Sequence, residues 1–371
     1  MSWTPLGLPA FLFVITVVVF FHELGHFLVA RACGVKVDIF SVGFGKEIFG
    51  FNDKTGTRWR LSWIPIGGYV KFAGDANAAS LPDQKAAEAM APAEREHVLF
   101  FKPLWQRALV AAAGPFANFV LAIILLTGLN MYTGHYALAP IVGTVVQGSA
   151  ADVAGIKSGD RVTAIDGAKI TEFEQLPQII TVSGGKTLVM DLVRDGNPLS
   201  LKVTPRTMKV RDPLGDMSTS VVIGVRPSTD KSAITFVKYG PGGAFVAAAT
   251  KSWDICKTTI LGLGQMIRGY ASADQLRGPV GIAGMTKQVA EFGFLALLNL
   301  TAVLSVSIGL ANLFPIPVLD GGHLLYYACE AVLGRPLGER AQDVGFRLGL
   351  VLVLGLVLLT TWNDLARLNL F

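Results

Sequence analysis

The stretch that decides the fold is FLFVITVVVFFHELGH, residues 11–26, in which an apolar run leads into two histidines and a glutamate. A spacing of four places His22 and His26 on one face of a helix, one turn apart. The two imidazoles can therefore share one zinc ion, and Glu23 can serve as a general base for the attacking water. Ionisable groups within an apolar span are costly and usually functional. The same pattern also fits polar residues at a helix end that only touch the membrane interface.

The composition predicts a polytopic α-helical membrane protein with some soluble mass. Of its 371 residues, 51% are hydrophobic and only 16% are charged, whereas a soluble domain usually carries about 25% charged residues. The net charge of +5 is modest, and no basic stripe with interleaved aromatic residues occurs, so no nucleic-acid partner is expected. The three cysteines are scattered, which predicts neither a disulfide framework nor a cysteine metal site.

Four apolar stretches are long enough to cross a bilayer core of about 30 Å, which takes about 20 helical residues. No Lys or Arg precedes the first stretch and no convincing cleavage site follows it, so we expect a retained span. Cations cluster between the first two stretches and again between the last two. By the positive-inside rule these loops are cytoplasmic and both termini face outward. The expected spans are 8–32, 104–132, 294–320 and 345–362, with a cytoplasmic loop at 321–344.

The loop at 33–103 is expected to hold a small membrane-associated β-sheet. From Val35 to Phe72, apolar residues alternate with glycines and an Asn-Asp turn signal. Because this stretch follows His26 directly, the sheet could line the same site. Three acidic residues of the loop are expected to be solvated charges: Asp38, Glu47 and Asp53.

The long segment after the second span opens as a β-rich domain at 133–207. The sequence AGIKSGDRV at 154–162 and the hairpin signal RDGN at 194–197 resemble a PDZ domain of the bacterial type. PDZ domains bind extended peptides by strand addition, so a peptide or protein C-terminus is the expected partner. The alternative is a β-domain that only spaces the helices. Residues 208–293 are expected to form a linker and an amphipathic helix lying on membrane lipid, or a soluble packing helix.

A catalytic zinc ion takes three protein ligands and keeps one open position, so a third ligand must come from elsewhere in the chain. The third span ends in NLFPIPVLDGGH, residues 312–323, where two prolines break the helix. By the expected topology, Asp320 then lies at the same membrane face as the two histidines. Asp320 is therefore the predicted third ligand, and a helix cap after the proline break is the alternative. His323 is expected in a supporting or loop role.

Together these motifs resemble the site-2 protease family of intramembrane zinc proteases, over nearly the whole chain. Within that family the bacterial regulator-of-sigma-E protease group is the most similar. Its elements resemble GP-x-x-N at 114–118, GYVKF at 68–72 and GPVGI at 278–282. The best-known members carry tandem PDZ domains, whereas one is expected here. This departure leaves open how substrates are screened by size.

The resemblance implies a regulated intramembrane protease of the bacterial inner membrane, active in stress response. Its expected substrates are single-span membrane proteins of the anti-sigma-factor type, trimmed first by another protease, and remnant signal peptides. Both termini and the PDZ-like domain would be periplasmic, with the active site near the cytoplasmic face. Zn²⁺ would be held by His22, His26 and Asp320, with Glu23 as the general base.

Substrate binding is expected at the β-loop, because a helical substrate hides its carbonyls and must be held extended. The residues predicted to hold it are Gly68, Tyr69, Val70 and Lys71. Asn312 is expected to hydrogen-bond the substrate backbone or the oxyanion, or to pack between helices.

Two other functions fit parts of the sequence. A membrane-anchored metalloprotease that works in the cytosol would take its third ligand from a soluble helix, such as Glu88, Glu94 or Glu96. A scaffold or chaperone of membrane proteins, built around the PDZ-like domain, would not require Glu23.

Overall fold

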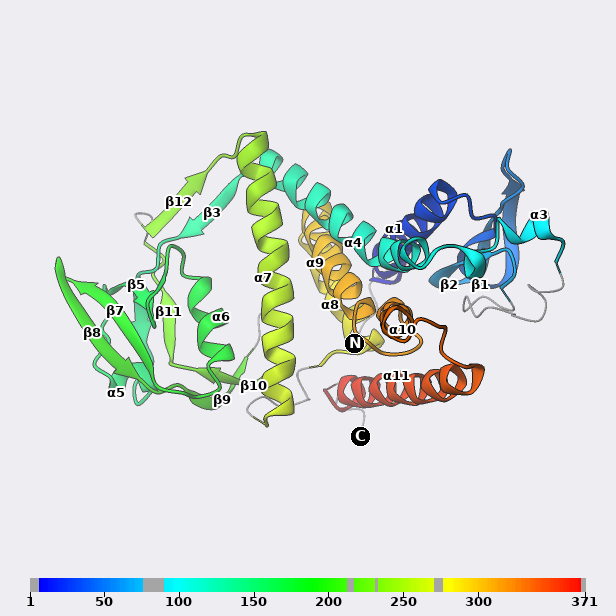
Figure 1. Ribbon diagram of the computed structural model, residues 1–371. Coiled ribbons are helices and arrows are strands. Elements are labelled where there is room, and N and C mark those ends of the chain that lie inside the picture. Colours follow the sequence, from blue (N-terminus) through cyan, green and yellow to red (C-terminus); the bar gives the residue numbers. More distant parts are fainter. Residues whose placement is uncertain (1–6, 76–89, 212–216, 231–232, 270–275, 368–371) are drawn as a thin grey trace. The chain divides into compact units, whose positions relative to one another are not determined.

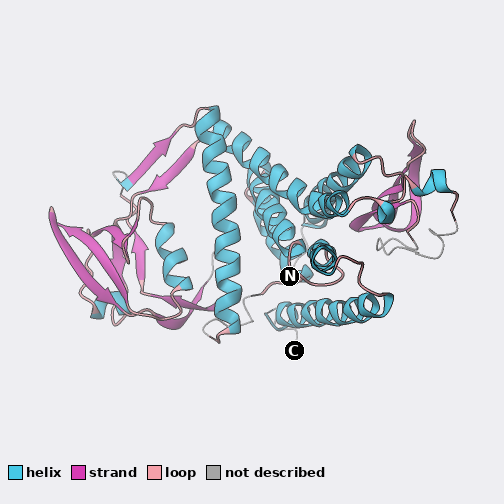
Figure 2. Ribbon diagram, in the orientation of Figure 1, coloured by secondary structure: helices cyan, strands magenta, loops and turns pink. Residues whose placement is uncertain are grey.

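The computed structural model describes residues 7–75, 90–211, 217–230, 233–269 and 276–367 (Figure 1). The chain divides into two compact units, one of residues 1–126 and 278–362 and one of residues 127–277 and 363–371. The first unit is mostly helical and the second is rich in strands (Figure 2). The elements that belong to or begin in the first unit are α1 (Gly7–Ala32), β1 (Val37–Asn52), β2 (Arg58–Phe72), α3 (Pro92–Arg95), η1 (Leu99–Phe101), α4 (Leu104–Thr133), α8 (Pro279–Glu291), α9 (Phe294–Asn312), α10 (Asp320–Leu333) and α11 (Glu339–Arg367).

Four helices are long and apolar enough to cross a membrane, as the sequence predicts: Gly7–Ala32, Leu104–Thr133, Phe294–Asn312 and Arg340–Arg367. The third of them ends earlier than the expected residue 320. Pro315 and Pro317 follow its end, and because proline lacks an N–H it cannot continue the helical hydrogen-bond ladder. After this irregular stretch the chain forms α10, in the segment that was expected to be the loop 321–344.

The apolar face of α1 is shared between two cores. Towards its start, Val14 is fully buried and packs with leucines of α9, including Leu300. Towards its end, Phe27 packs with Phe40 of the sheet and Val110 of α4. The helix that carries the His-Glu motif is therefore held on one side by helices and on the other by strands.

β1 and β2 are bent, so each supplies two segments to one mixed sheet, in which 37–42 runs antiparallel to 68–72 and parallel to 58–62. Phe40 of β1 pairs with Val70 and with Trp59, on opposite sides, while Phe51 also pairs with Trp59. The order across the sheet is therefore 68–72, 37–42, 58–62 and 47–52. Residues 68–72 form an edge of this sheet. An edge strand leaves one row of backbone groups available for another chain.

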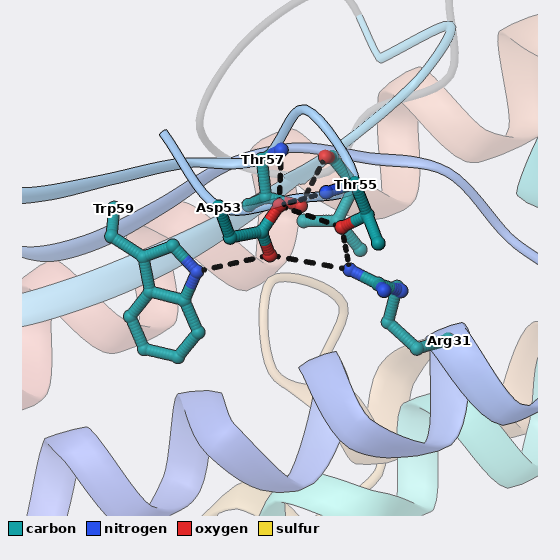
Figure 3. Close-up of polar contacts among 6 residues, drawn as sticks. Arg31, Asp53, Thr55, Thr57 and Trp59 are labelled. Atoms are coloured by element: carbon teal, nitrogen blue, oxygen red, sulfur yellow. Dashed lines mark hydrogen bonds and ion pairs between the residues drawn. The ribbon is translucent and has the colours of Figure 1, made fainter. Parts of the chain in front are cut away.

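The turn of this hairpin is fastened to the last turn of α1 by Asp53 (Figure 3). One carboxylate oxygen accepts hydrogen bonds from the N–H groups of Thr55 and Thr57, at 2.8 and 2.9 Å, and from the Thr55 hydroxyl at 2.6 Å. The other oxygen accepts from Trp59 Nε1 at 3.3 Å and Arg31 Nη1 at 3.4 Å. Burial alone would raise the pKa of Asp53, but these donors hold it well below its usual range.

Asp53 is therefore not the solvated loop charge that was expected. Glu47 is exposed to solvent, as expected, and forms an ion pair with Arg58 across the hairpin. No single-sequence pattern distinguishes a carboxylate such as Asp53 from a solvated one, because its partners lie in other segments.

The second unit begins within α4 and contains a four-stranded sheet in the order β6-β5-β7-β8. Its core gathers strand residues such as Val162 and Leu192 with Leu176 of the short helix α6. β11 pairs with β4, and β12 pairs with β3, so the β-rich region extends past the expected boundary at 207 to residue 237. The elements are β3 (His135–Leu138), β4 (Val142–Val145), α5 (Ala150–Val153), β5 (Arg161–Ile165), β6 (Ala168–Lys169), α6 (Gln175–Val182), β7 (Leu188–Arg194), β8 (Asn197–Val203), β9 (Arg206–Arg211), β10 (Met217–Val222), β11 (Val225–Pro227), β12 (Ile234–Val237) and α7 (Pro241–Ile267).

Asp160 links the turn before β5 to the end of β7. It is fully buried and accepts hydrogen bonds from Arg194 Nε and Nη2, both at 2.7 Å, and from the N–H of Lys157 at 2.8 Å. Burial alone would raise the pKa of Asp160, but these partners hold it below its usual range.

Replacing Asp160 by alanine should loosen the second unit, because Arg194 then loses its buried partner. We expect a loss of about 3 kcal/mol in local stability, measured by hydrogen exchange of residues 155–203 in the detergent-solubilised chain. An aspartate whose folded pKa is lowered stabilises above its unfolded pKa of about 3.9, and loses that effect as the pH falls through the folded value. The difference from wild type should therefore shrink below about pH 4. Glu174→Ala, at an exposed residue without a capping hydrogen bond, is the matched control and should leave exchange unchanged.

Candidate active site

The two histidines of α1 face the same point. Their ring centroids lie 4.9 Å apart, and the Nε2 atoms are separated by 3.3 Å. His26 is buried, and its Nδ1 lies 2.7 Å from the carbonyl oxygen of Val110 in α4. Because this carbonyl can only accept, Nδ1 carries the proton and Nε2 has a free lone pair.

The third predicted ligand meets the histidines at the start of α10. Asp320 Oδ2 lies 3.1 Å from His22 Nε2, and Oδ1 lies 3.4 Å from His26 Nε2. The three residues offer ligand atoms within 4.8 Å of one another. Two imidazole nitrogens and one carboxylate oxygen form a donor set typical of catalytic zinc sites. The residues present therefore fit a zinc ion.

The backbone around Asp320 is shaped by the break in the helix. Val318 adopts φ 121°, a value that is a clear outlier for a β-branched residue. Gly321 packs against the backbone carbonyls of Leu313 and Phe314, where a Cβ atom would overlap them. The strained segment and the close turn together place Asp320 at the level of the histidines, although α9 ends at Asn312.

A cavity of about 220 Å³ opens at this point. Its lining includes Glu23, whose carboxylate is hydrogen-bonded to the backbone of Val70 in the edge strand. The catalytic candidate and the strand thus contact each other directly. Most of the predicted site residues line the cavity: His22, Glu23, His26, Gly68, Tyr69, Val70, Asn312 and Asp320.

Five other residues named from the sequence, the predicted substrate-binding residue Lys71 among them, lie outside the three-ligand group or outside the described residues. Lys71 pairs with Ile39 in the sheet and is not in the lining of this cavity. His323 lines the cavity but is not part of the three-ligand group. Glu94 and Glu96 lie in and just after α3, outside that group, and Glu88 falls outside the described residues.

Two cavity residues had no signal in the sequence. Arg107 of α4 forms an ion pair with Glu330 of α10, with N–O distances of 3.0 and 2.5 Å, and its guanidinium lies 5.1 Å from the ring centroid of Tyr327. Burial raises the pKa of Tyr327 to about 12, so its hydroxyl stays protonated at neutral pH. The ion pair joins α4 to the helix that begins with Asp320. Its partners are separated by 223 positions, which no sequence pattern connects.

Comparison with known proteins gives matches to metalloproteases along the chain. Residues 10–356 match the model of peptidase family M50. A protein of Agrobacterium fabrum, named as a candidate zinc metalloprotease, is 43% identical over 358 residues, covering 96% of this chain and 95% of that protein. Metalloprotease MmpA of Caulobacter vibrioides is 40% identical over 386 residues, covering 98% and 96%. Regulator of sigma-E protease RseP of Salmonella typhimurium is 31% identical over 456 residues, covering 98% and 99%.

The fold, the donor set and these relatives define a zinc metalloprotease with four helices long and apolar enough to cross a membrane. The chain belongs to peptidase family M50, the site-2 protease family.

Gly114 allows α4 to approach the site closely, and its replacement should disturb the zinc centre. A Cβ atom there would overlap the His26 ring, so Gly114→Ala must displace this imidazole. We expect zinc affinity to fall about 10-fold or more, measured by metal analysis after dialysis. Gly128→Ala, in the same helix, is the control because its Cβ would meet nothing within 4 Å. Full zinc retention by Gly114→Ala would contradict the close approach.

Proposed function

We propose that this protein cleaves single-span membrane proteins inside the bacterial inner membrane, as the last step of regulated intramembrane proteolysis. The observation that carries the proposal is the convergence of His22, His26 and Asp320 beside Glu23 at the ends of apolar helices. Anti-sigma factors of the stress response and remnant signal peptides are the proposed substrates. The name of the Salmonella typhimurium relative, a regulator of sigma-E protease, supports the first of these.

The topology proposed from the loop charges places both termini and the second unit in the periplasm. The active site then lies near the cytoplasmic face, where water can enter the cavity. Peptide hydrolysis needs such access, because lipid surrounding the helices excludes water.

Each side chain of the site has a separate proposed role in peptide hydrolysis. His22, His26 and Asp320 would hold the zinc ion, which when bound polarises the scissile carbonyl and makes water a better nucleophile. Glu23 takes a proton from the attacking water and later gives it to the leaving amine. The backbone of Val70 orients the Glu23 carboxylate by its hydrogen bond. Asn312, in the lining of the cavity, is placed to hydrogen-bond the substrate backbone or the oxyanion.

The edge strand at 68–72 is the proposed binding site for an unwound substrate. Val70 is hydrogen-bonded to Glu23 through its backbone, and the N–H of Phe72 donates to Asp75 at 3.1 Å. In a strand, alternate N–H groups point to the same side. Val70 and Phe72 therefore turn their N–H groups away from β1, where Glu23 and Asp75 accept them, and a substrate strand pairing along this edge would replace Asp75 at Phe72. Gly68, Tyr69 and Val70 would contact the substrate, while Lys71 supports the strand from within the sheet.

The second unit is proposed to be a PDZ-like domain that binds a peptide or protein C-terminus. In its support, the hairpin β7–β8 follows a short helix, and β11 has a single partner strand, β4, among the described residues. A single partner leaves one edge of β11 for strand addition. The amphipathic helix α7, with Trp253 and Ile260 exposed, is proposed to lie against membrane lipid.

Zinc content and cleavage should separate in variants of the site. Glu23→Gln should keep one zinc per chain and lose cleavage of a model single-span substrate by at least about 100-fold, the usual scale for a general base. His22→Ala and Asp320→Ala should lose both zinc and cleavage. Unchanged zinc in Asp320→Ala would instead favour a cytosolic metalloprotease with another third ligand. Unchanged function in Glu23→Gln would favour a scaffold or chaperone.

The hydrogen bond from Val70 to Glu23 can be tested by comparing two variants. Val70→Pro removes the backbone N–H that faces the Glu23 carboxylate, whereas Val70→Ala keeps it and shortens the side chain. We expect Val70→Pro to lose cleavage about 10-fold relative to Val70→Ala, since one backbone hydrogen bond is worth about 1.4 kcal/mol. Both variants should retain zinc. Equal cleavage by the two would mean that the backbone of Val70 does not orient Glu23.

A further inference from the structure

Both histidines of the proposed ligand set have their second ring nitrogen met by the same neighbouring helix. His26 Nδ1 faces the carbonyl of Val110, and His22 Nδ1 lies 3.2 Å from the side-chain amide of Asn118, also in α4. The pairs run in opposite order along the two helices, so α1 and α4 are antiparallel here. One helix therefore supplies an outer contact to each of the two imidazoles.

The position of the proton on the His22 imidazole determines which amide atom of Asn118 must face it. His22 Nε2 converges with His26 Nε2 and Asp320, so it is the nitrogen that faces a metal. A neutral imidazole carries one proton, which must then be on Nδ1, where it requires an acceptor. The structure places Asn118 Nδ2, a donor, at this nitrogen. It also leaves Asn118 Oδ1 buried and without a hydrogen-bond partner among the described residues.

A half-turn of the amide about its last bond resolves this mismatch. Amide oxygen and nitrogen are nearly the same in shape, and their positions are assigned by hydrogen bonding. With Oδ1 at His22, the imidazole N–H has an acceptor. One atom of the Asn118 amide lacks a partner in either orientation. The need of the His22 N–H for an acceptor therefore selects the orientation with Oδ1 at the ring.

The position of Asn118 is fixed from the other side by α9. Asn118 is fully buried, and its backbone carbonyl accepts a hydrogen bond from Ser305 Oγ at 2.9 Å. Gly309 packs so closely that an added Cβ atom would lie 3.1 Å from Asn118 Cβ. Three helices thus hold the amide against the ring of His22, with little freedom to move away.

We propose that Asn118 is a positioning residue whose Oδ1 accepts the Nδ1–H of His22, fixing the tautomer and the ring so that Nε2 faces the zinc ion. The proposal rests on the ligand set of the proposed function. Outer contacts of this kind raise the basicity of a ligating imidazole and hold its orientation. Asn118 is not in the lining of the cavity, so it would act through the imidazole of His22.

The test compares Asn118→Leu with Asn118→Asp in the full chain in detergent. Leucine has a similar size but no acceptor, so its zinc affinity should fall about 10- to 100-fold. Aspartate keeps an acceptor oxygen, so it should bind zinc at least as tightly as wild type. Affinity is measured by competition with a chelator, and the ligand field by the absorption spectrum of the cobalt-substituted protein. Ser307→Ala, in the same helix α9, is the matched control, since its hydroxyl donates to the carbonyl of Val303 within the helix, and its affinity should be unchanged.

Two results would overturn the proposal. Wild-type zinc affinity in Asn118→Leu would show that His22 needs no acceptor. A loss in Asn118→Asp as large as in Asn118→Leu would show that Asn118 only packs between helices, because a buried carboxylate is tolerated only where a donor meets it. Asn118→Asp decides the matter even if the leucine variant fails to fold. A failure of the ligand set itself is distinguishable, since His22→Ala would then retain zinc.

Discussion

The site depends on one constraint, which is that three ionisable side chains must share a small space within a bundle of apolar helices. The side chains of His22, His26 and Asp320 are only 12%, 11% and 18% exposed. A buried charge without a partner costs several kcal/mol, so each of these groups requires compensation nearby. Their mutual contacts, the Val110 carbonyl and the Asn118 amide supply it. A divalent cation at the same point would be the natural counter-charge for the carboxylate.

The same constraint accounts for the irregular backbone between α9 and α10. Chain without regular hydrogen bonding is tolerated at membrane depth only where it lines a polar cavity. Here Pro315 and Pro317 end the helical ladder, and Val318 adopts an unfavourable φ. A φ of this kind costs about 1–3 kcal/mol and persists where the surrounding packing holds it. At its other end, α10 is held to α4 by the Arg107–Glu330 ion pair, so the helix cannot easily tilt away.

The sheet of β1 and β2 is joined to α1 at two places. Its turn is joined to the end of α1 through Asp53 and Arg31 (Figure 3), and its edge contacts Glu23 through Val70. Both contacts are to α1, which also carries the two histidine ligands. The helix α1 therefore positions both the strand proposed to hold the substrate and the two histidines. A shift of α1 would move the strand and the histidines together.

By itself the sequence determined the parts whose signal is local. Four apolar runs, the spacing of His22 and His26, and the prolines before Asp320 each follow from period and composition, and the structure has four apolar helices and a meeting of the three ligands. The family resemblance added Asn312 and drew attention to GYVKF at 68–72, of which all but Lys71 line the cavity with Asn312.

Only the tertiary structure decided what depends on contacts between distant segments. The helix α10 and the pairing of β11 with β4 follow from hydrogen bonds that no local pattern records. The partners of Asp53, Arg107 and Asn118 were likewise unreadable. Hydrophobic period reports which face of an element is buried, whereas the identity of a buried polar partner is set only when the elements pack.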